Sequence, residues 1–387
     1  MSARGIAKGG LLFVALAVAS ASAWPAAALA NGLGSVYVAD PTAGSVTGID
    51  GLHGVVVTAI AVPSAPLALA YAPGGDAVFV VCSTEGEVAR IKTKSESVMG
   101  TLDLGREISA LTVSPDGQWL WGVSAKTGTV ARFDLETGDV AAEAAIAGRP
   151  TSLAVAPDGK RVYVGLEEKR SVAVLNADGL GGIGELPLPA APVYLAMARD
   201  GRRLYVGCQA LDTIYTFDLE RLALAGSIAL PANTGAIALR PYARELYVAL
   251  PSRDSVGVVD LDGNRLLGEI SLAGEPHGIA FGPDGVRAYF TVGGAPGSLA
   301  IVDAAQRTIV GQVQLGEDPR ELVVSPLMPG QKEQDPLGPP LTVPAKLPRT
   351  GDPLPDLRSL VLGCGLLASA GLLSLRGCRT GGQEIES

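Results

Sequence analysis

The chain has 387 residues, of which 39 are acidic and 30 are Lys or Arg, giving a formal net charge of −9 at pH 7. Lys and Arg do not gather in any stretch, so the charge pattern argues against a nucleic-acid surface and against nucleic acid as a partner. The 50 glycines and 27 prolines indicate many turns, and a hydrophobic content of 48% is ample for a buried core. One repetitive domain explains this length better than two unrelated ones.

Residues 1–30 are typical of a secretory signal peptide. Arg4 and Lys8 precede the apolar run Leu11–Val18, and small-x-small cleavage sites end at Ala23 and at Ala30. We place cleavage after Ala30, because the mature chain then begins at the edge of the first strand.

An aromatic residue recurs every 42 residues along the following 260 or so positions. The series runs Tyr37, Phe79, Trp121, Tyr163, Tyr205, Tyr247 and Tyr289. Six residues before most of them stands a turn of the Pro-Asp-Gly type, in which proline presets φ and glycine accepts φ > 0. A period in this range is typical of four-stranded propeller blades, and we expect the aromatic series to be buried between blades.

Each repeat has room for four strands and for no helix of any length. In one repeat, apolar stretches at Leu153–Val155, Arg161–Gly165 and Ser171–Leu175 give three strands, and the segment from Asp139 to Ile146 represents the more variable fourth. The sequence therefore predicts an all-β fold over residues 31–326, a seven-bladed β-propeller with four-stranded blades.

The two ends of the repeat region indicate how the ring closes. A last turn at Ser325-Pro326 has no aromatic strand after it, whereas Tyr37 lies in an aromatic strand with no turn before it. We expect the N-terminal strand Ser35–Asp40 to complete the blade begun by Glu321–Ser325, so that no sheet edge stays open at the seam.

The repeat resembles the YVTN-type β-propeller repeat of surface-layer and other secreted microbial proteins. The segment from Pro157 to Val164, Pro-Asp-Gly-Lys-Arg-Val-Tyr-Val, is the most similar, and the likeness extends from Gly34 to Pro326. Such a motif specifies blade structure, so function has to be argued from a site.

In propellers of this strand order, the loops that lead into the inner strand lie around one mouth of the central channel. Aligned positions there are Ala65, Glu107, Arg149, Ala191, Asn233, Glu275 and Asp318, followed two residues later by Leu67, Ser109, Thr151, Val193, Gly235, His277 and Arg320. We predict a possible binding surface for a protein or glycan from the polar members, Glu107, Arg149, Asn233, Glu275, His277, Asp318 and Arg320. The alternative is that His277 is an ordinary loop residue and the acids are solvated.

No cofactor, metal site or catalytic residue is predicted. Cys82 and Cys208 lie three whole blades apart, too far for a disulfide, and are expected to be buried packing residues. Covalent haem is excluded because the sequence has no Cys-x-x-Cys-His motif. Aspartates that follow the third strands, as in Asp260-Leu-Asp-Gly263, are expected to cap turns rather than bind calcium.

The C-terminal region contains a spacer and an anchoring signal. Residues 327–346 hold five prolines and predict a semi-rigid linker. Residues 347–387 contain Leu347-Pro-Arg-Thr-Gly351, then the 17-residue apolar stretch Ser359–Leu375, and then a tail, 376–387, that begins with Arg376. This order resembles the LPxTG sorting signal of sortase substrates in Gram-positive bacteria.

The resemblance implies that a sortase recognises Leu347, Pro348, Thr350 and Gly351, and cleaves between Thr350 and Gly351. The Thr350 carbonyl would pass to a peptidoglycan amine, which places the protein outside the cell on the wall and leaves residues 359–375 in the membrane only transiently. A plain membrane anchor is the alternative, because 17 apolar residues followed by arginine could just span a bilayer. The tail after Arg379 is longer and more acidic than such signals usually show.

Two functions of different class remain. The first is a wall-anchored binding or structural module, and the second is a secreted propeller enzyme of lactonase type with its active site in the channel mouth. The sequence favours the first, and no enzyme activity, because the chain contains only two histidines, His53 and His277.

Overall fold

The computed structural model describes residues 34–82, 86–104 and 107–326. The predicted signal peptide (1–30), linker (327–346) and sorting signal (347–387) lie outside these residues. Within them, no helix has the length and apolar character needed to cross a membrane.

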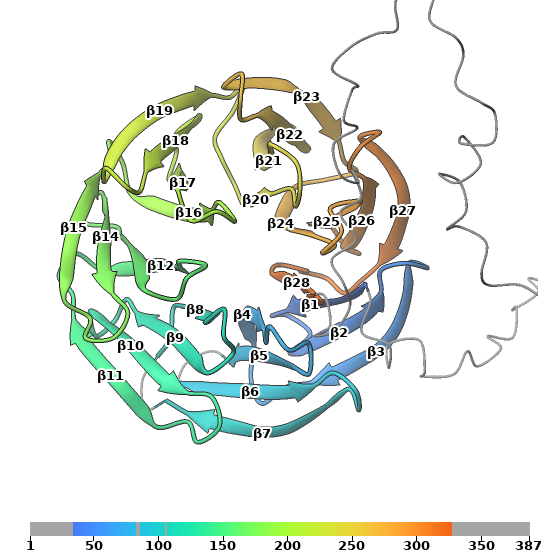
Figure 1. The fold of residues 1–387 in the computed structure, drawn as a ribbon. Helices are drawn as coiled ribbons and strands as arrows, with labels where there is room; N and C mark the ends of the chain where they lie inside the picture. Colours follow the sequence, from blue (N-terminus) through green and yellow to red (C-terminus); the bar gives the residue numbers. More distant parts are fainter. Residues whose placement is uncertain (1–33, 83–85, 105–106, 327–387) are drawn as a thin grey trace, which may run out of the picture. The chain divides into compact units, whose positions relative to one another are not determined.

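Seven four-stranded antiparallel sheets form a ring, as the sequence predicted (Figure 1). We number them blades 1 to 7, with blade 7 built from both ends of the described chain. The inner strands are β4 (Pro66–Tyr71), β8 (Ala110–Val113), β12 (Pro150–Val155), β16 (Pro192–Met197), β20 (Ile237–Leu239), β24 (Pro276–Phe281) and β28 (Leu322–Val324). The second strands are β5 (Ala77–Cys82), β9 (Trp119–Ser124), β13 (Arg161–Leu166), β17 (Arg203–Cys208), β21 (Glu245–Leu250), β25 (Arg287–Val292) and, in blade 7, β1 (Ser35–Asp40).

The two outer strands of each blade follow in the same order. The third strands are β6 (Glu87–Lys92), β10 (Thr129–Asp134), β14 (Ser171–Asn176), β18 (Thr213–Asp218), β22 (Ser255–Asp260), β26 (Ser298–Asp303) and β2 (Ser45–Asp50). The outermost are β7 (Ser97–Asp103), β11 (Val140–Ala145), β15 (Gly182–Pro187), β19 (Ala223–Ala229), β23 (Arg265–Ser271), β27 (Thr308–Gln314) and β3 (Val55–Ala61). One short 3₁₀ helix, η2 (Pro251–Arg253), follows β21.

Burial falls from the second strand outward. Every residue of β5 is buried, whereas most of β27 is exposed. The second strand has neighbouring blades on both faces, so its sequence is a continuous apolar run, whereas the outermost strand faces solvent along most of its length.

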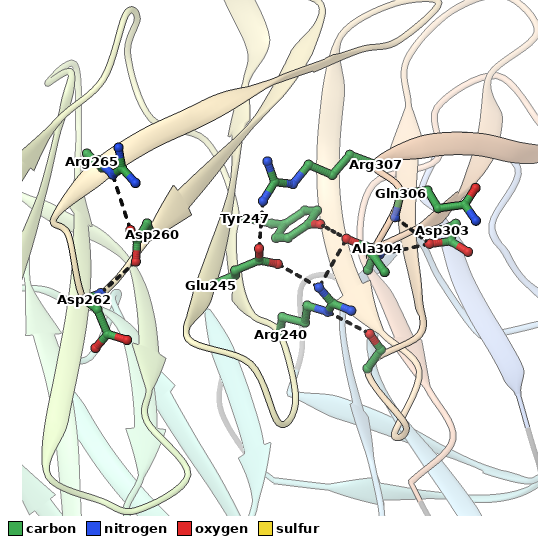
Figure 2. Close-up of polar contacts among 12 residues, drawn as sticks. Arg240, Glu245, Tyr247, Asp260, Asp262, Arg265, Asp303, Ala304, Gln306 and Arg307 are labelled. Carbon is green, nitrogen blue, oxygen red and sulfur yellow. Dashed lines mark hydrogen bonds and ion pairs between the residues drawn. The ribbon is translucent and has the colours of Figure 1, made fainter. Parts of the chain in front are cut away.

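The repeated aromatic residues form the predicted buried series, each at most 4% exposed. The ring of Tyr247 packs edge-on against Phe281 of the next blade at a centroid distance of 4.9 Å. Its hydroxyl donates a 2.8 Å hydrogen bond to the Ala304 carbonyl, also in the next blade (Figure 2). The aromatic side chain therefore joins neighbouring blades through both its ring and its polar end.

A salt-bridge network adds a second connection between blades 5 and 6. Figure 2 shows Glu245 on β21 between two arginines, with Arg240 in its own blade at 2.9 Å and Arg307 of blade 6 at 2.8 Å. The Glu245 side chain is 17% exposed, so removal of either arginine would leave a largely buried charge short of one partner.

The ring closes where the sequence predicted. Strand β1 pairs with β28 in antiparallel register, with Val36 opposite Val324. The hydrogen bonds run on beyond β28, because the Ala39 N–H donates to the Glu321 carbonyl at 2.9 Å and the Ser325 N–H donates to the Ser35 carbonyl at 2.8 Å. The seam therefore fixes the backbone at Glu321.

Capping aspartates and buried cysteines are also confirmed. The last residue of most third strands accepts a backbone hydrogen bond from a residue two or three positions on, as Figure 2 shows for Asp260 and Asp303. Cys82 and Cys208 are buried free thiols, and burial raises the pKa of Cys208 to about 11. Such a thiol stays protonated at neutral pH and acts as a small apolar residue.

Candidate functional site: the channel mouth

A cavity of about 550 Å³ lies at one mouth of the channel, and we call it the mouth pocket. Its lining comes from blades 1, 4, 5, 6 and 7, so it spans the centre of the ring rather than a gap between two neighbours. The lining residues are Pro41, Leu67, Tyr194, Gly235, Pro251, Glu275, Pro276, His277, Asp318, Arg320 and Glu321.

The seam places the blade 7 residues of this pocket. The Arg320 N–H donates to the Ala39 carbonyl at 3.0 Å, and the Arg320 carbonyl accepts a 2.6 Å hydrogen bond from the hydroxyl of Thr291 in blade 6. The same hydroxyl accepts a 2.7 Å bond from the Gly278 N–H. Thr291 is fully buried, so it ties the backbone beside His277 to the backbone of Arg320.

Gly278 is required by this close approach. A Cβ atom at position 278 would lie 2.6 Å from the Arg320 carbonyl oxygen and 2.9 Å from the Thr291 hydroxyl oxygen. Other blades carry larger residues at the equivalent position, so the glycine is a local requirement of the boundary between blades 6 and 7.

His277 lies half-buried beside Gly293 of the same blade. A Cβ atom at position 293 would lie 2.6 Å from the His277 Nε2 atom, so glycine leaves the space that the imidazole occupies. Burial lowers the pKa of His277, and the positive charge of Arg320 lowers it further, while Glu275 and Asp318 oppose the shift. The imidazole is therefore neutral at pH 7.

Among the described residues that line the mouth pocket, Arg320 is the only one with a cationic side chain. Its Nε atom lies 2.7 Å from an oxygen of Asp318, and the arginine side chain is 51% exposed. This pair neutralises one of the three carboxylates of the pocket at its wet rim.

Glu321 and Tyr194 also line the mouth pocket. The Glu321 side chain is exposed to solvent, and desolvation by the surrounding ring raises the pKa of its carboxyl group. Within the described residues, no hydrogen bond or ion pair reaches that carboxylate. Burial also raises the pKa of Tyr194, with a further contribution from the charge of Glu321 and an opposing one from Arg320. Residues of blades 4 and 7 thus interact electrostatically across the channel.

The structure separates the seven predicted surface residues into two groups. Glu275, His277, Asp318 and Arg320 line the mouth pocket together. The other three lie outside it: Glu107 pairs with Lys126 at 3.4 Å, Arg149 pairs with Glu167, and Asn233 is exposed. Leu347, Pro348, Thr350 and Gly351 lie outside the described residues.

Sequence reasoning missed Tyr194 and Glu321. Both stand one residue after the second aligned position, where the other blades have Ala68, Ala110, Ser152, Ala236 and Gly278. A search for long side chains at this position, where most blades have a small residue, would have found them, because a long side chain at that position can extend only into the channel. Across the residues described, no group of three or more His, Cys, Asp or Glu could hold a metal ion.

Comparison with known proteins gives structural neighbours only. No family model matches the chain, and no curated protein matches it. Hydrazine synthase from Kuenenia stuttgartiensis has a similar fold, with a TM-score of 0.61, 17% identity, and coverage of 67% of this chain and 90% of that one. Dihydro-heme d1 dehydrogenase NirN, solved in complex with DHE, has a TM-score of 0.62, 15% identity, and coverage of 76% and 75%.

At these identities the likeness establishes the fold and nothing about ligands or reactions. The described part of the chain is a seven-bladed β-propeller whose N-terminal strand closes the last blade.

Proposed function

We propose that this chain is a cell-wall-anchored binding module that presents the mouth pocket to an extracellular ligand. One observation carries the binding part of the proposal: five blades contribute to a single cavity in which charged and polar side chains converge beside a smaller apolar portion of the wall. A concave site that gathers polar groups from several elements is a common place for a ligand to bind. A closed ring also suits a binding role, because its rigid sheets hold loops from distant parts of the sequence in fixed positions.

The display part of the proposal rests on the sequence. The sequence contains, in order, the patterns of a signal peptide, a YVTN-type ring, a Pro-rich spacer and an LPxTG-type signal. A protein that is attached to the wall through its C terminus, with a spacer between wall and ring, needs these segments in this order. Covalent attachment would run through the Thr350 carbonyl, with a sortase and peptidoglycan as partners.

A matched pair of substitutions tests the binding site without any assumption about ligand charge. Leu67 and Val193 occupy aligned positions in blades 1 and 4 and are 46% and 37% exposed, but only Leu67 lines the mouth pocket. Wild-type protein and both tryptophan variants would be screened against a fragment library by ligand-observed NMR. We expect Leu67→Trp to abolish binding of most hits and Val193→Trp to leave it unchanged. Equal binding by all three proteins would place the ligand site elsewhere.

A second candidate is a hydrolase of lactonase type that works in the same pocket. The opposite directions of the pKa shifts of His277 and Glu321 favour it, because both residues line the pocket and each shift favours the uncharged form that a general base or a general acid uses. A panel of lactones incubated with wild-type protein and His277→Gln would decide. Turnover that His277→Gln removes would support this reading, and no turnover by either protein would leave the binding module.

A further inference from the structure

The pairing between β24 and β25 is interrupted at the edge of the mouth pocket. His277 and Gly278 stand opposite Thr291 outside the register of the two strands, which resumes at Ile279. In blades 1 to 4 the residues aligned with Gly278 and Thr291 do pair, as Ala68 with Val81, Ala110 with Val123, Ser152 with Gly165 and Tyr194 with Gly207. Regular sheet pairing therefore does not hold the backbone of blade 6 at His277 and Gly278.

The hydroxyl of Thr291 takes the place of the missing pair. It accepts a 2.7 Å hydrogen bond from the Gly278 N–H and donates a 2.6 Å hydrogen bond to the Arg320 carbonyl of blade 7. Thr291 is fully buried, so both bonds lie in surroundings of low dielectric constant, which strengthen them. Its aligned residues in the other blades have no polar side chain. They are Ala39, Val81, Val123, Gly165, Gly207 and Ala249.

One hydroxyl thus joins the backbone segments that carry two residues of the pocket. His277 precedes Gly278 in blade 6, and Arg320 is held in blade 7, where its N–H donates to the Ala39 carbonyl at 3.0 Å. Without the hydroxyl, blade 7 would still hold Arg320, whereas the buried Gly278 N–H would lose its partner at a cost in free energy. The backbone beside His277 would then shift relative to Arg320.

We infer that Thr291 is a positioning residue of the mouth pocket, whose hydroxyl fixes His277 of blade 6 relative to Arg320 of blade 7. Thr291 does not itself line the pocket, whereas His277 and Arg320 do. Polar groups select a ligand only when supporting residues hold their spacing, and Thr291 provides that support here. The inference rests on the proposed function, because it concerns the pocket that the proposal assigns to a ligand.

The titration of His277 reports this spacing without any ligand. Burial lowers the pKa of His277, the charge of Arg320 lowers it further, and Glu275 and Asp318 oppose the shift. A change that moves the imidazole away from the guanidinium group and toward water weakens both lowering effects. The pKa of His277 should therefore rise toward its ordinary value when the hydroxyl is lost.

The test follows the His277 ring by NMR across a pH titration of the full-length chain, prepared with isotope-labelled histidine. The chain has two histidines, so His277→Gln assigns the two signals. We expect Thr291→Val, which keeps the shape of the side chain, to raise the midpoint of the His277 titration. Thr291→Ser keeps the hydroxyl and should leave the midpoint at the wild-type value. Thr291→Ala removes the hydroxyl in a second way should the valine variant not fold, since blades 5 and 7 have alanine at this position.

Two further variants separate positioning from a general loss of stability. Thr93→Val removes another buried hydroxyl, which donates to the Gly75 carbonyl at 2.9 Å in blade 1, and it should leave the His277 midpoint unchanged. In an Arg320→Gln background, Thr291→Val should raise the midpoint by less than it does in the wild type. The reason is that the charge through which Thr291 acts is absent there.

The outcomes separate this inference from the proposed function. A wild-type midpoint after loss of the Thr291 hydroxyl, a raised midpoint in Thr291→Ser, or an equal rise with and without the Arg320 charge would overturn the role of Thr291. Such a result, together with fragments whose binding Leu67→Trp blocks, would leave the pocket as the binding site. The expected midpoints without any fragment binding would support the role of Thr291 and count against the binding module.

Discussion

Glu321, which lines the mouth pocket, should make the stability of the ring depend on pH. Its surroundings raise its pKa above the value it has in the unfolded chain, so the folded state holds its proton more tightly than the unfolded state does. The free energy of unfolding therefore falls as pH rises from the unfolded pKa, about 4.3, through the raised folded pKa.

Replacing Glu321 with glutamine should make the protein more stable at neutral pH. The amide has nearly the same shape and no charge to desolvate, so the variant should unfold at a higher temperature than wild type at pH 7. The gain should disappear below about pH 4, where the glutamate is protonated in both states. Thermal unfolding followed by circular dichroism across this range measures it, and a variant less stable than wild type at pH 7 would show that an unseen partner stabilises the charge.

Gly278 should not tolerate alanine. The new methyl group would meet the Arg320 carbonyl and the Leu322 side chain, both at 2.6 Å, so blades 6 and 7 would have to separate slightly. We expect a loss of about 1–3 kcal/mol in the free energy of unfolding, as overpacking usually costs. Gly268→Ala is the control, because a Cβ atom there would meet nothing within 4 Å, and it should be neutral or slightly stabilising. Urea denaturation of both variants would settle the comparison.

At the scale of strands, β1 is the element on which closure depends. It supplies blade 7 with its second strand, which is buried at all six positions, and it provides the carbonyl that holds Arg320 in place. A blade without its second strand would lose both its central pairing and its packing against blades 6 and 1.

Two truncations test the role of β1. A chain that starts at Gly34 keeps the strand, and a chain that starts at Pro41 lacks it. The shorter chain should melt lower by several degrees or more, since loss of a fully buried strand exceeds a few kcal/mol and opens a sheet edge. Melting temperatures within a degree or two of each other would mean that the ring closes in another way.

Much of the ring was predictable from the sequence because all seven blades share the same packing geometry. The 42-residue series from Tyr37 to Tyr289, the turns and the seam all follow from that shared geometry. The mouth pocket was only partly predictable, because it depends on exceptions to the repeat. The charged or titratable residues Glu275, His277, Asp318 and Arg320 could be recognised in the sequence. Tyr194 and Glu321 could not, because they come together only when blades 4 and 7 face each other across the channel.

At the scale of the whole molecule, different parts of the ring provide stability and form the pocket. The outer rim and the interfaces between blades provide stability, and the mouth pocket gathers loops from five blades that lie far apart in the sequence. In our proposal the C-terminal segment attaches the protein to the wall, and this attachment does not depend on the structure of the ring. Changes in the pocket should therefore leave anchoring unaffected, and changes in the sorting signal should leave the ring folded.

Attachment to the wall is the central claim of the proposal, and the chemical nature of the mature C terminus tests it most directly. Native cells would be extracted with hot detergent and then digested with muramidase, and the C-terminal peptide of the released protein would be identified by mass spectrometry. We expect detergent to leave the protein behind, and muramidase to release a chain that ends at Thr350 linked to a wall fragment. Recovery of a detergent-soluble mature protein that still carries residues 351–387 would contradict sortase anchoring and leave a plain membrane anchor in its place.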